Sequence, residues 1–479
     1  MSALVVDPAE HTCRKEAFFE RLRAQLSEGA RLVGYYGRPA DDSGQVVITA
    51  VLSANGTLSV LRTGLSRPHS HRALSAELPA FQIFERELHE QYGLRLHEHP
   101  WLKPVRSDAP YPFYSLKGKE VHEVAVGPIH AGVIEPGHFR FMCLGEVVHH
   151  LEIQLGYQHR GVEALLLKKD PRALGPLVET IAGDTSVAHA WAYCEALEAL
   201  AGVTTSFEAQ VSRAIGLELE RIAMHLASLA GMATDIAFLQ GGTTYGRLRT
   251  TAINSSMLAC GSRFGRGWVR PGGAWAKLES GQQATLRANL KLLKDDLAII
   301  NPHLLGARSV QHRLKGIGRV TREQAIELGI VGVAARASGI EVDARADLPG
   351  PVHLRYGIRG VIENSGDCWA RAVVRIREID ESLRWLEEVL DAFPTCSPDA
   401  ARVGALKPDT LAVAVCEGWR GEVVHCLETD AAGGLRHYKV QDPSLRNWFA
   451  LALSLRENEI SDFPICNKSF DLSYCGNDL

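Results

Sequence analysis

The stretch VSRAIGLELERIAMHLASL (residues 211–229) decides the fold class of this chain. Its apolar residues recur every three or four positions, the spacing that places them along one side of an α-helix. Residues 187–201, 284–297 and 368–389 repeat the pattern. In and just after the last of these, one buried stripe is expected to contain Val373, Ile376, Ile379, Leu383 and Leu390. Four or more long helices predict a bundle whose facing side chains can build a buried site.

The first hundred residues follow a different pattern. Residues 12–28 have helical spacing, whereas residues 31–36, 45–52 and 57–61 are rich in β-forming residues. The dipeptide Asn55-Gly56 lies between the last two runs and is typical of a hairpin turn. A hairpin packed on helices predicts a small α/β domain.

The predicted fold is therefore α+β, with two domains. Residues 1–106 form the small α/β domain, and residues 107–118, rich in proline and aromatic residues, form a linker. Residues 119–479 form a large, mostly helical domain with a helix-bundle core, since a chain of 479 residues exceeds the usual size of one core. Short strands at 121–126 and 138–144 predict a small sheet at its start, and the pattern turns helical from Glu146 onward.

Composition excludes several classes of protein. A net charge of −4 gives no basic face for nucleic acid. No run approaches the roughly 18 apolar residues that cross a bilayer, and the first residues lack the features of a secretory signal. We therefore expect a cytoplasmic protein whose membrane attachment depends on partner subunits. The ten cysteines contain no C-x-x-C pair, the spacing typical of metal sites.

Several motifs resemble one family. They are GPIHAGVIEPGHFRF (127–141), GYQHRGVE (156–163), RPGG (270–273), RASG (336–339) and GDCWAR (366–371). In this order they are similar to the large subunit of membrane-bound, energy-converting [NiFe] hydrogenases such as formate hydrogenlyase, a family homologous to the 49 kDa subunit of complex I. FERELHEQYG (84–93), followed by His99-Pro100, resembles the 30 kDa subunit of complex I, which formate hydrogenlyase carries as an N-terminal fusion.

The resemblance fails at the metal ligands. AGDTSVAH (182–189) stands where the family has Cys-Gly-x-Cys-x-x-x-His, and DFPICN (462–467) stands where it has Asp-Pro-Cys-x-x-Cys. Such a nickel site needs four thiolates. The residues at these cysteine-equivalent positions are Ala182, Thr185, Pro464 and Asn467. We expect no nickel-iron centre, and no processing of the C-terminal segment, which in these hydrogenases follows nickel insertion.

Five residues remain candidates for chemistry. The resemblance places Glu163 where hydrogenases relay protons, and His138 where complex I donates to a quinone headgroup; the tyrosine that works beside that histidine would align with Ala182 or Gly183. Alternatively, Glu163 is a structural carboxylate paired with an arginine and His138 is a loop histidine. The remaining candidates are Asp184, His189 and Asp462.

Each of these has a structural alternative. His189 could be a core histidine, and residues 184–186 could cap the following helix, because Asp, Thr and Ser accept from free backbone N–H groups. Asp184, Glu163 and Asp462 could together bind Mg²⁺. Further charged residues are expected to form internal ion pairs, since unpaired buried charge is costly; they are Arg270, Arg336, Arg345, Arg371, Arg375, Asp343 and Asp367.

The resemblance implies a nickel-free, hydrogenase-like component of a membrane-associated, complex I-like oxidoreductase that couples electron transfer to ion translocation. It implies an iron–sulfur small subunit carrying a [4Fe–4S] cluster, membrane-arm subunits, and a peripheral position on the cytoplasmic face of the inner membrane, with no cofactor on this chain. Three alternatives stay open: a quinone-reducing NADH dehydrogenase-type subunit, an active [NiFe] hydrogenase using Cys466 and Cys475 as ligands, and a non-catalytic docking subunit.

Overall fold

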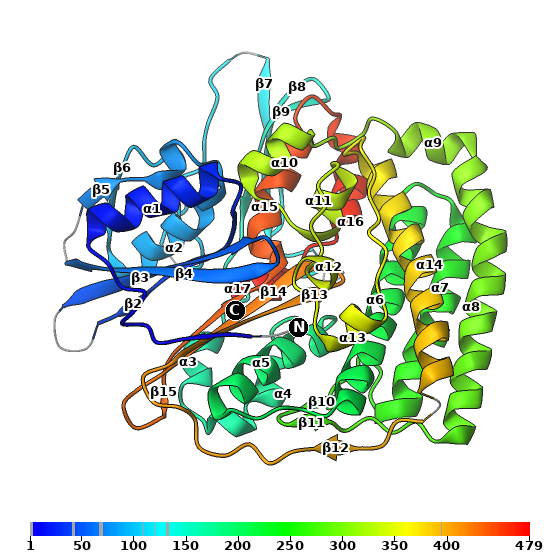
Figure 1. Cartoon of the computed structure of the whole chain (residues 1–479). Coiled ribbons are helices and arrows are strands. Elements are labelled where there is room, and N and C mark those ends of the chain that lie inside the picture. The colour runs from blue at the N-terminus through cyan, green and yellow to red at the C-terminus, as the bar shows by residue number, and fades with distance from the viewer. Residues whose placement is uncertain are drawn as a thin grey trace.

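The computed structural model describes residues 3–40, 44–66, 70–107, 109–118, 120–130, 134–393 and 395–479. Three parts of the predictions lie outside these residues: Asp108 in the predicted linker, residue 119 at the predicted start of the large domain, and residues 131–133 within the motif at 127–141. Helices and several small sheets are mixed along the chain, which confirms the α+β class (Figure 1).

The N-terminal unit is a three-stranded antiparallel sheet with helices on one face. Its strands are β2 (Arg31–Pro39), β3 (Gln45–Ala54) and β4 (Thr57–Ser66), and its helices are α1 (Lys15–Ser27) and α2 (Gln82–Tyr92). Asn55 and Gly56 turn between β3 and β4 with φ of 50° and 74°, the left-handed values that a two-residue hairpin requires. The predicted helix and strands are confirmed. A short parallel pair, β5 (Ser70–Arg72) and β6 (Arg95–His97), lies beside them.

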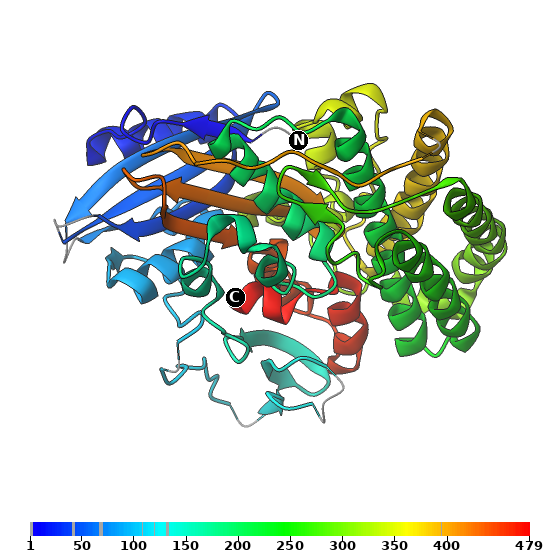
Figure 2. The ribbon, with the colours of Figure 1, turned by 90° about the horizontal axis from the view of Figure 1, so that it is seen from below.

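The other face of this sheet packs on a second, four-stranded antiparallel sheet (Figure 2). Its strands, in spatial order, are β1 (Leu4–Val6), β13 (Leu411–Gly418), β14 (Gly421–Thr429) and β15 (Leu435–Gln441). Val33, Val51 and Val60 of the first sheet share one apolar cluster with Val413 and Val424 of the second. The chain's first strand is therefore an edge of the C-terminal sheet, while the boundary at 107–118 stays a prediction.

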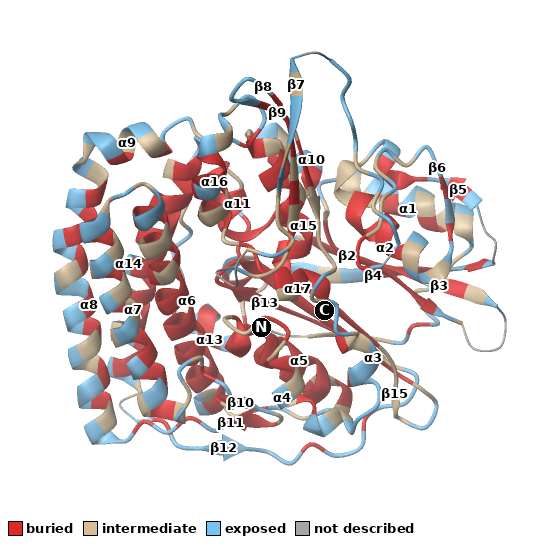
Figure 3. Ribbon diagram, turned by 180° about the vertical axis from the view of Figure 1, so that it is seen from behind, coloured by how far each residue is buried: buried red, intermediate tan, exposed pale blue. Residues whose placement is uncertain are grey.

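Helices dominate the rest of the large domain (Figure 1). The long helices are α5 (Ser186–Ala201), α6 (Phe207–Asp235), α7 (Leu239–Cys260), α8 (Ser280–Gly306) and α14 (Cys368–Ala392). All four predicted helices are confirmed, and the whole predicted stripe on α14 is buried. Helix α6 is buried over most of its length, whereas α8 exposes one side (Figure 3). Ser206 caps α6 by accepting from Ala209 N, and Asp367 caps α14 by accepting from Ala370 N.

A third sheet and the C-terminal helices complete the domain. The sheet contains the two predicted strands, β7 (Val121–Val126) and β8 (His138–Leu144), together with β9 (Val147–Gln154). The expectation of a helical pattern from Glu146 onward is therefore wrong for β9 and for β13 to β15. The C-terminal helices are α15 (Pro443–Ser454), α16 (Phe463–Phe470) and α17 (Tyr474–Asp478).

Short elements connect these parts. They are α3 (Val162–Leu166), α4 (Gly175–Val178), α9 (Arg308–Leu314), α10 (Arg322–Leu328), α11 (Gly332–Ala337), α12 (Ala344–Asp347), α13 (Pro351–Arg355), β10 (Val269–Arg270), β11 (Gly273–Ala274) and β12 (Asp399–Ala400). Among the described residues, we find no helix with the length and apolar character needed to span a bilayer.

Candidate functional site

The turn between β13 and β14 brings charged residues into the middle of the molecule. Gly418 pairs with Gly421 across this hairpin, which leaves Trp419 and Arg420 as its two turn residues. The backbone of the turn lies against α11 so closely that a Cβ on Gly332 would stand 1.8 Å from the carbonyl oxygen of Arg420. We call residues 417–422 the hairpin tip.

The cysteine-equivalent positions carry no thiol in the folded chain. Ala182 and Thr185 are buried just before α5, whereas Pro464 is exposed in the first turn of α16. Asn467 lies one turn later, and its Nδ2 is 3.5 Å from the hydroxyl of Tyr474. These side chains offer neither the charge nor the soft sulfur donors of a nickel site.

The two cysteines proposed as substitute ligands have separate environments. Cys466 Sγ lies 4.0 Å from Cys368 Sγ in the core, and Cys475 Sγ lies 3.4 Å from Ser473 Oγ. In the part of the chain that the structure describes, no group of three or more His, Cys, Asp or Glu side chains is arranged to hold a metal ion.

Arg420 of the hairpin tip contacts the segment that contains the first two cysteine-equivalent positions, 182 and 185. Its Nη1 and Nη2 each lie 2.7 Å from a carboxylate oxygen of Asp184, and Nη1 is 3.2 Å from Thr185 Oγ1. Its Nε donates to the carbonyl oxygen of Asp471. Burial opposes this charge, but the carboxylates of Asp184 and Asp471 raise the pKa of Arg420 above its usual value. A permanent cation therefore stands beside the cysteine-equivalent positions, and the residues present do not fit a nickel-iron centre.

Asp471 links Arg420 to a second ion pair. Lys468 Nζ lies 2.9 Å from Asp471 Oδ1, and Ser228 Oγ donates to the other carboxylate oxygen. Although burial opposes ionisation, Lys468 and Arg420 lower the pKa of Asp471 to about 2. The carboxylate is therefore ionised at neutral pH.

The interpretation of residues 184–186 as a helix cap is wrong. Thr185 occupies the cap position of α5 without a capping side-chain hydrogen bond, because Asp184 and Thr185 both face Arg420. Glu220 of α6 caps the helix instead, accepting from Val187 N at 2.7 Å and from Ala188 N at 3.3 Å. Burial raises the pKa of Glu220 to about 8.

His189 is a fully buried residue of α5 with two polar partners. Its Nε2 lies 3.2 Å from Asp442 Oδ2, and its Nδ1 lies 3.0 Å from His425 Nε2. His425 Nδ1 is 2.7 Å from the hydroxyl of Tyr438. Burial and the neighbouring His189 hold the pKa of His425 well below its usual value, so this ring is neutral. The four side chains form a continuous buried chain of hydrogen bonds.

Glu163 pairs with a lysine rather than with the expected arginine. Its Oε1 accepts from Val440 N at 3.0 Å and lies 3.1 Å from Lys439 Nζ. Lys439 also lies 2.7 Å from Glu87 of the N-terminal unit, which pairs in turn with Arg106. Although burial opposes it, Lys439 and Arg106 lower the pKa of Glu87 to about 2. Glu163 therefore belongs to an ion-pair chain that joins the two parts of the molecule.

The motif at 156–163 holds the C-terminal segment. The N–H groups of Gly156 and Gln158 donate to the carboxylate of Asp478 at 2.8 and 2.9 Å, and Arg160 N donates to the carbonyl oxygen of Leu479 at 2.8 Å. Tyr474 is buried against Trp448, with ring centroids 4.8 Å apart. The segment forms the short helix α17 and packs in the core.

His138 lies on β8 beside Phe113, with ring centroids 5.0 Å apart. Its Nε2 is buried and has no hydrogen-bond partner among the residues that the structure describes. Burial, aided by the positive charge of Arg140, lowers the pKa of His138. The ring is therefore neutral at pH 7.

The three carboxylates of the conceivable Mg²⁺ site have three different cationic partners. Asp462 lies 3.6 Å from Arg313, Asp184 pairs with Arg420, and Glu163 pairs with Lys439. Burial raises the pKa of Asp462. Because each carboxylate is engaged separately, the arrangement gives no support to a shared cation.

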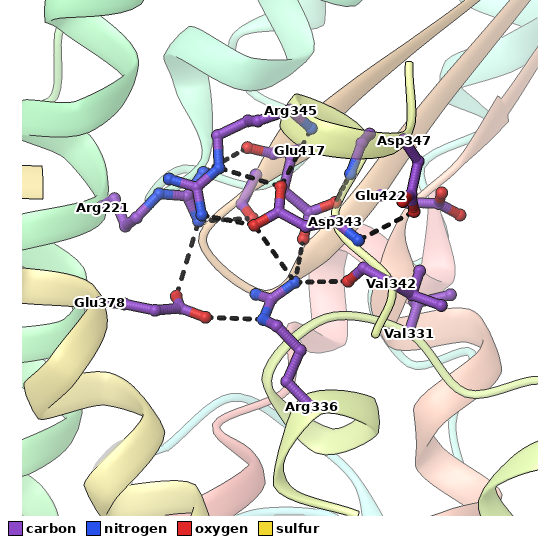
Figure 4. A network of polar contacts seen from close by, with 12 residues as sticks. Arg221, Val331, Arg336, Val342, Asp343, Arg345, Asp347, Glu378, Glu417 and Glu422 are labelled. Carbon is purple, nitrogen blue, oxygen red and sulfur yellow. Dashed lines mark hydrogen bonds and ion pairs between the residues drawn. The ribbon is translucent and has the colours of Figure 1, made fainter. Parts of the chain in front are cut away.

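On its other side the hairpin tip meets a buried arginine network (Figure 4). Arg336 of α11 reaches Glu378 Oε1 at 2.6 Å and Glu417 Oε1 at 2.8 Å. Arg345 binds Asp343 at 2.6 Å and Glu218 at 3.1 Å. The predicted internal pairing of Arg336, Arg345 and Asp343 is confirmed.

The other predicted ion pairs are wrong. Arg371 donates to Ser469 Oγ and to the carbonyl oxygens of Gly366 and Gly318, and Arg375 donates to backbone carbonyls. Within the described residues, neither has a carboxylate at ion-pair distance. Arg270 is exposed, and Asp367 caps α14 instead of pairing with an arginine. Backbone carbonyls accept hydrogen bonds from these guanidinium groups without neutralising their charge, and burial lowers the pKa of Arg375 to about 10.

Sequence reasoning missed the residues of the hairpin tip, above all Glu417 and Arg420. One local signal was available. Two apolar runs, 411–416 and 423–427, flank a pair of glycines spaced for a two-residue turn, Gly418 and Gly421. Such a pattern is typical of a hairpin, but nothing local indicates which residues its turn contacts.

Comparisons with known proteins support the resemblance carried by the motifs. The family of the 49 kDa subunit of respiratory-chain NADH dehydrogenase matches residues 235–405. The chain is 30% identical over 364 residues to the membrane-bound hydrogenase subunit alpha of Pyrococcus furiosus, covering 73% of this chain and 85% of that protein. It is 29% identical over 351 residues to the carbon monoxide-induced hydrogenase of Rhodospirillum rubrum, covering 73% and 97%. It is also 29% identical over 438 residues to formate hydrogenlyase subunit 5 of Escherichia coli, covering 85% and 76%.

Fold and site together define a hydrogenase-type large-subunit scaffold without metal-binding thiolates. The chain belongs to the family that unites the large subunits of membrane-bound, energy-converting hydrogenases with the 49 kDa subunit of complex I. The similarity to formate hydrogenlyase subunit 5 covers 85% of the chain, more than residues 119–479 contain, so it extends into the N-terminal unit.

Proposed function

We propose that this chain is the nickel-free, hydrogenase-like subunit of a membrane-associated, complex I-like oxidoreductase, in which electron transfer drives ion translocation. Family membership supports the scaffold and its place in such an assembly. One observation carries the nickel-free assignment: the Arg420 guanidinium lies against Asp184 and Thr185, at the first pair of cysteine-equivalent positions. A metal cation there would have no thiolate ligand and would be repelled by this charge.

The redox groups of the assembly then belong to partners. We expect an iron–sulfur small subunit with a [4Fe–4S] cluster, because this chain has no close cysteine pair to hold one. We also expect membrane-arm subunits, which would hold the chain at the cytoplasmic face of the inner membrane. The names of the membrane-bound and formate hydrogenlyase relatives, each a subunit of a complex, support this arrangement.

The test is to isolate the affinity-tagged chain from detergent-solubilised membranes of its native host. Mass spectrometry should find an iron–sulfur protein and integral membrane proteins in constant ratio to the chain. Electron paramagnetic resonance should show a [4Fe–4S] signal, and elemental analysis should find nickel well below one atom per chain. Recovery of the chain alone, or nickel near one atom per chain, would contradict the proposal.

His138 favours quinone reduction as a second candidate function. Its unpartnered Nε2 can donate to or accept from a carbonyl or hydroxyl group. The tyrosine that would assist it in complex I is replaced at Ala182 or Gly183. Labelling with a photoreactive quinone analogue should fall in His138→Ala but not in His122→Ala, an exposed histidine on the neighbouring strand. Equal labelling of both variants would reject quinone binding at His138, and the chain would then serve only to dock partner subunits and to couple their reactions.

A further inference from the structure

The arginine network around the hairpin tip contains more carboxyl groups than arginines (Figure 4). Its carboxyl groups are Glu218, Asp343, Glu378, Glu417 and Glu422, and its arginines are Arg31, Arg221, Arg336 and Arg345. We call these nine residues the hairpin-tip cluster. Asp347 and Arg446 lie at its edge and add one charge of each sign. All members except Arg31 are buried, and among these nine residues there is one more carboxyl group than there are arginines. The buried Arg375 lies outside this set but also acts on Glu378 by its charge, so the excess is local to the side of the cluster that holds Glu417.

A net charge in a buried place is costly, and a proton removes it more cheaply than structural change does. We propose that the hairpin-tip cluster holds one exchangeable proton on the Glu417 carboxyl, which it releases and rebinds near neutral pH. The inference deepens the proposed function, on which it rests, because an ion-translocating assembly needs groups that change protonation during turnover. The titration itself is a property of this chain alone.

Glu417 is the member least engaged by cations. Its Oε1 is 2.8 Å from Arg336 Nη1, an atom that also donates to the carbonyl oxygen of Val342. Its Oε2 accepts from Ala344 N at 3.0 Å and has no second donor within the described residues. Burial, together with the carboxylates of Asp343 and Glu422, raises the pKa of Glu417 to about 7 in spite of Arg336 and Arg221.

The other carboxyl groups have stronger partners. Asp343 accepts two hydrogen bonds from the Arg345 guanidinium, and Glu422 accepts two from Arg31. Glu378 lies 2.6 Å from Arg336 and 2.7 Å from His225 Nε2. Although burial opposes ionisation, these cations and hydrogen bonds lower the pKa of each of these carboxyl groups and of Glu218. They stay ionised when Glu417 titrates.

Two buried nitrogens beside Glu378 are left without a hydrogen-bond partner in the described part of the chain. They are Arg336 Nη2 and His225 Nδ1, and both belong to side chains that bind Glu378. The His225 ring lies 6.0 Å from that of Trp419, whose Nε1 donates to the carbonyl oxygen of Asp184. The cluster thus extends toward the cysteine-equivalent positions.

The opposite side of the cluster approaches solvent. Arg31, whose side chain is 24% exposed, lines an open cavity of about 440 Å³ between the N-terminal unit and α10, and Val342 lines it as well. His353 of α13 faces Glu218 and Arg345, and burial lowers its pKa to about 3, so it stays neutral. The cluster therefore lies between this cavity and the segment that contains Asp184.

The experiment is infrared difference spectroscopy of the purified full-length chain, titrated from about pH 5 to about pH 9. The carbonyl band of a protonated, buried carboxyl group should disappear with a midpoint near 7 in the wild type. It should be lost in Glu417→Gln, which keeps an acceptor for Arg336. Glu220→Gln is the matched control, because Glu220 is a second buried carboxyl group with a raised pKa outside the cluster; this variant should keep the Glu417 band.

The variant Glu422→Gln tests what raises the pKa of Glu417. Removing this neighbouring carboxylate should shift the midpoint of the Glu417 band to lower pH, provided that excess negative charge holds the proton. A band that still titrates with a midpoint near 7 in the double variant Glu220→Gln, Glu417→Gln, or a midpoint unmoved in Glu422→Gln, would overturn the inference. Failure of the chain to purify with membrane subunits would refute the proposed function and leave this titration unaffected.

Discussion

Replacing Tyr474 with alanine should lower the free energy of unfolding by about 2–4 kcal/mol. The side chain is only 6% exposed, and its ring lies 4.8 Å from that of Trp448 and 6.4 Å from that of Phe139. Burial of such a ring stabilises by roughly 1.5–3 kcal/mol, and aromatic pairs add about 0.5–1.5 kcal/mol. The cavity left behind cannot collapse easily, because Asp478 fixes the end of the segment to the backbone of Gly156.

Urea unfolding followed by tryptophan fluorescence measures this change, with two matched controls. Tyr474→Phe should cost less than about 1 kcal/mol, because the hydroxyl makes only one long contact, 3.5 Å from Asn467 Nδ2. Tyr114→Ala removes a ring that is 44% exposed and should cost less than about 1 kcal/mol as well. A loss for Tyr474→Ala no larger than that for Tyr114→Ala would refute the conclusion that the C-terminal segment is part of the core.

Three further predictions concern metal content, domain organisation and acid stability. Elemental analysis of the chain from its native host should find nickel well below one atom per chain, and hydrogen uptake should be undetectable; stoichiometric nickel would show that other ligands replace Ala182 and Thr185. Limited proteolysis should cut within residues 107–118 before it cuts the helices, and a segment that resists cleavage, with halves that cannot be expressed apart, would indicate one cooperative core. Glu87→Gln should destabilise the protein by roughly 3 kcal/mol at neutral pH, because a folded-state pKa of about 2 lies below the unfolded value of 4.5. The contribution is complete above about pH 4.5 and is lost as pH falls toward about 2, so chemical unfolding of both proteins at several pH values should converge in acid; a constant difference would contradict the ion pairing.

Periodicity predicted the elements that have one buried face or a strong local signal. The stripe on α14 and the Asn55-Gly56 hairpin are examples. Strands β13 and β14 were missed because both of their faces are buried, so their sequences show no alternation of apolar and polar residues. Helix α7 was missed because glycines and threonines weaken its pattern.

Some features of the candidate site could likewise be predicted from the sequence, and others could not. The resemblance located Asp184 and Thr185 as replacements for ligands, because motif position is a local property of the sequence. The partner of Asp184 is 236 residues away, and only the packing of the hairpin tip brings Arg420 to it. The same holds for Glu163, whose cation is Lys439 of a strand that was not predicted. Contacts at this separation are fixed by tertiary structure and leave no periodic signal in the sequence.

The hairpin tip adds a second difference from a nickel site, beyond the four cysteine-equivalent positions. A buried guanidinium, that of Arg420, lies against Asp184 and Thr185. A cysteine restored at position 185 would meet a guanidinium that is already held by Asp184 and Asp471. That cation would pair with a thiolate and compete with the metal for it. Removing Arg420 would in turn leave the buried carboxylate of Asp471 with Lys468 as its remaining direct cationic partner in the described structure. Restoring a thiolate at position 185 would therefore also disturb the ion pair between Arg420 and Asp184.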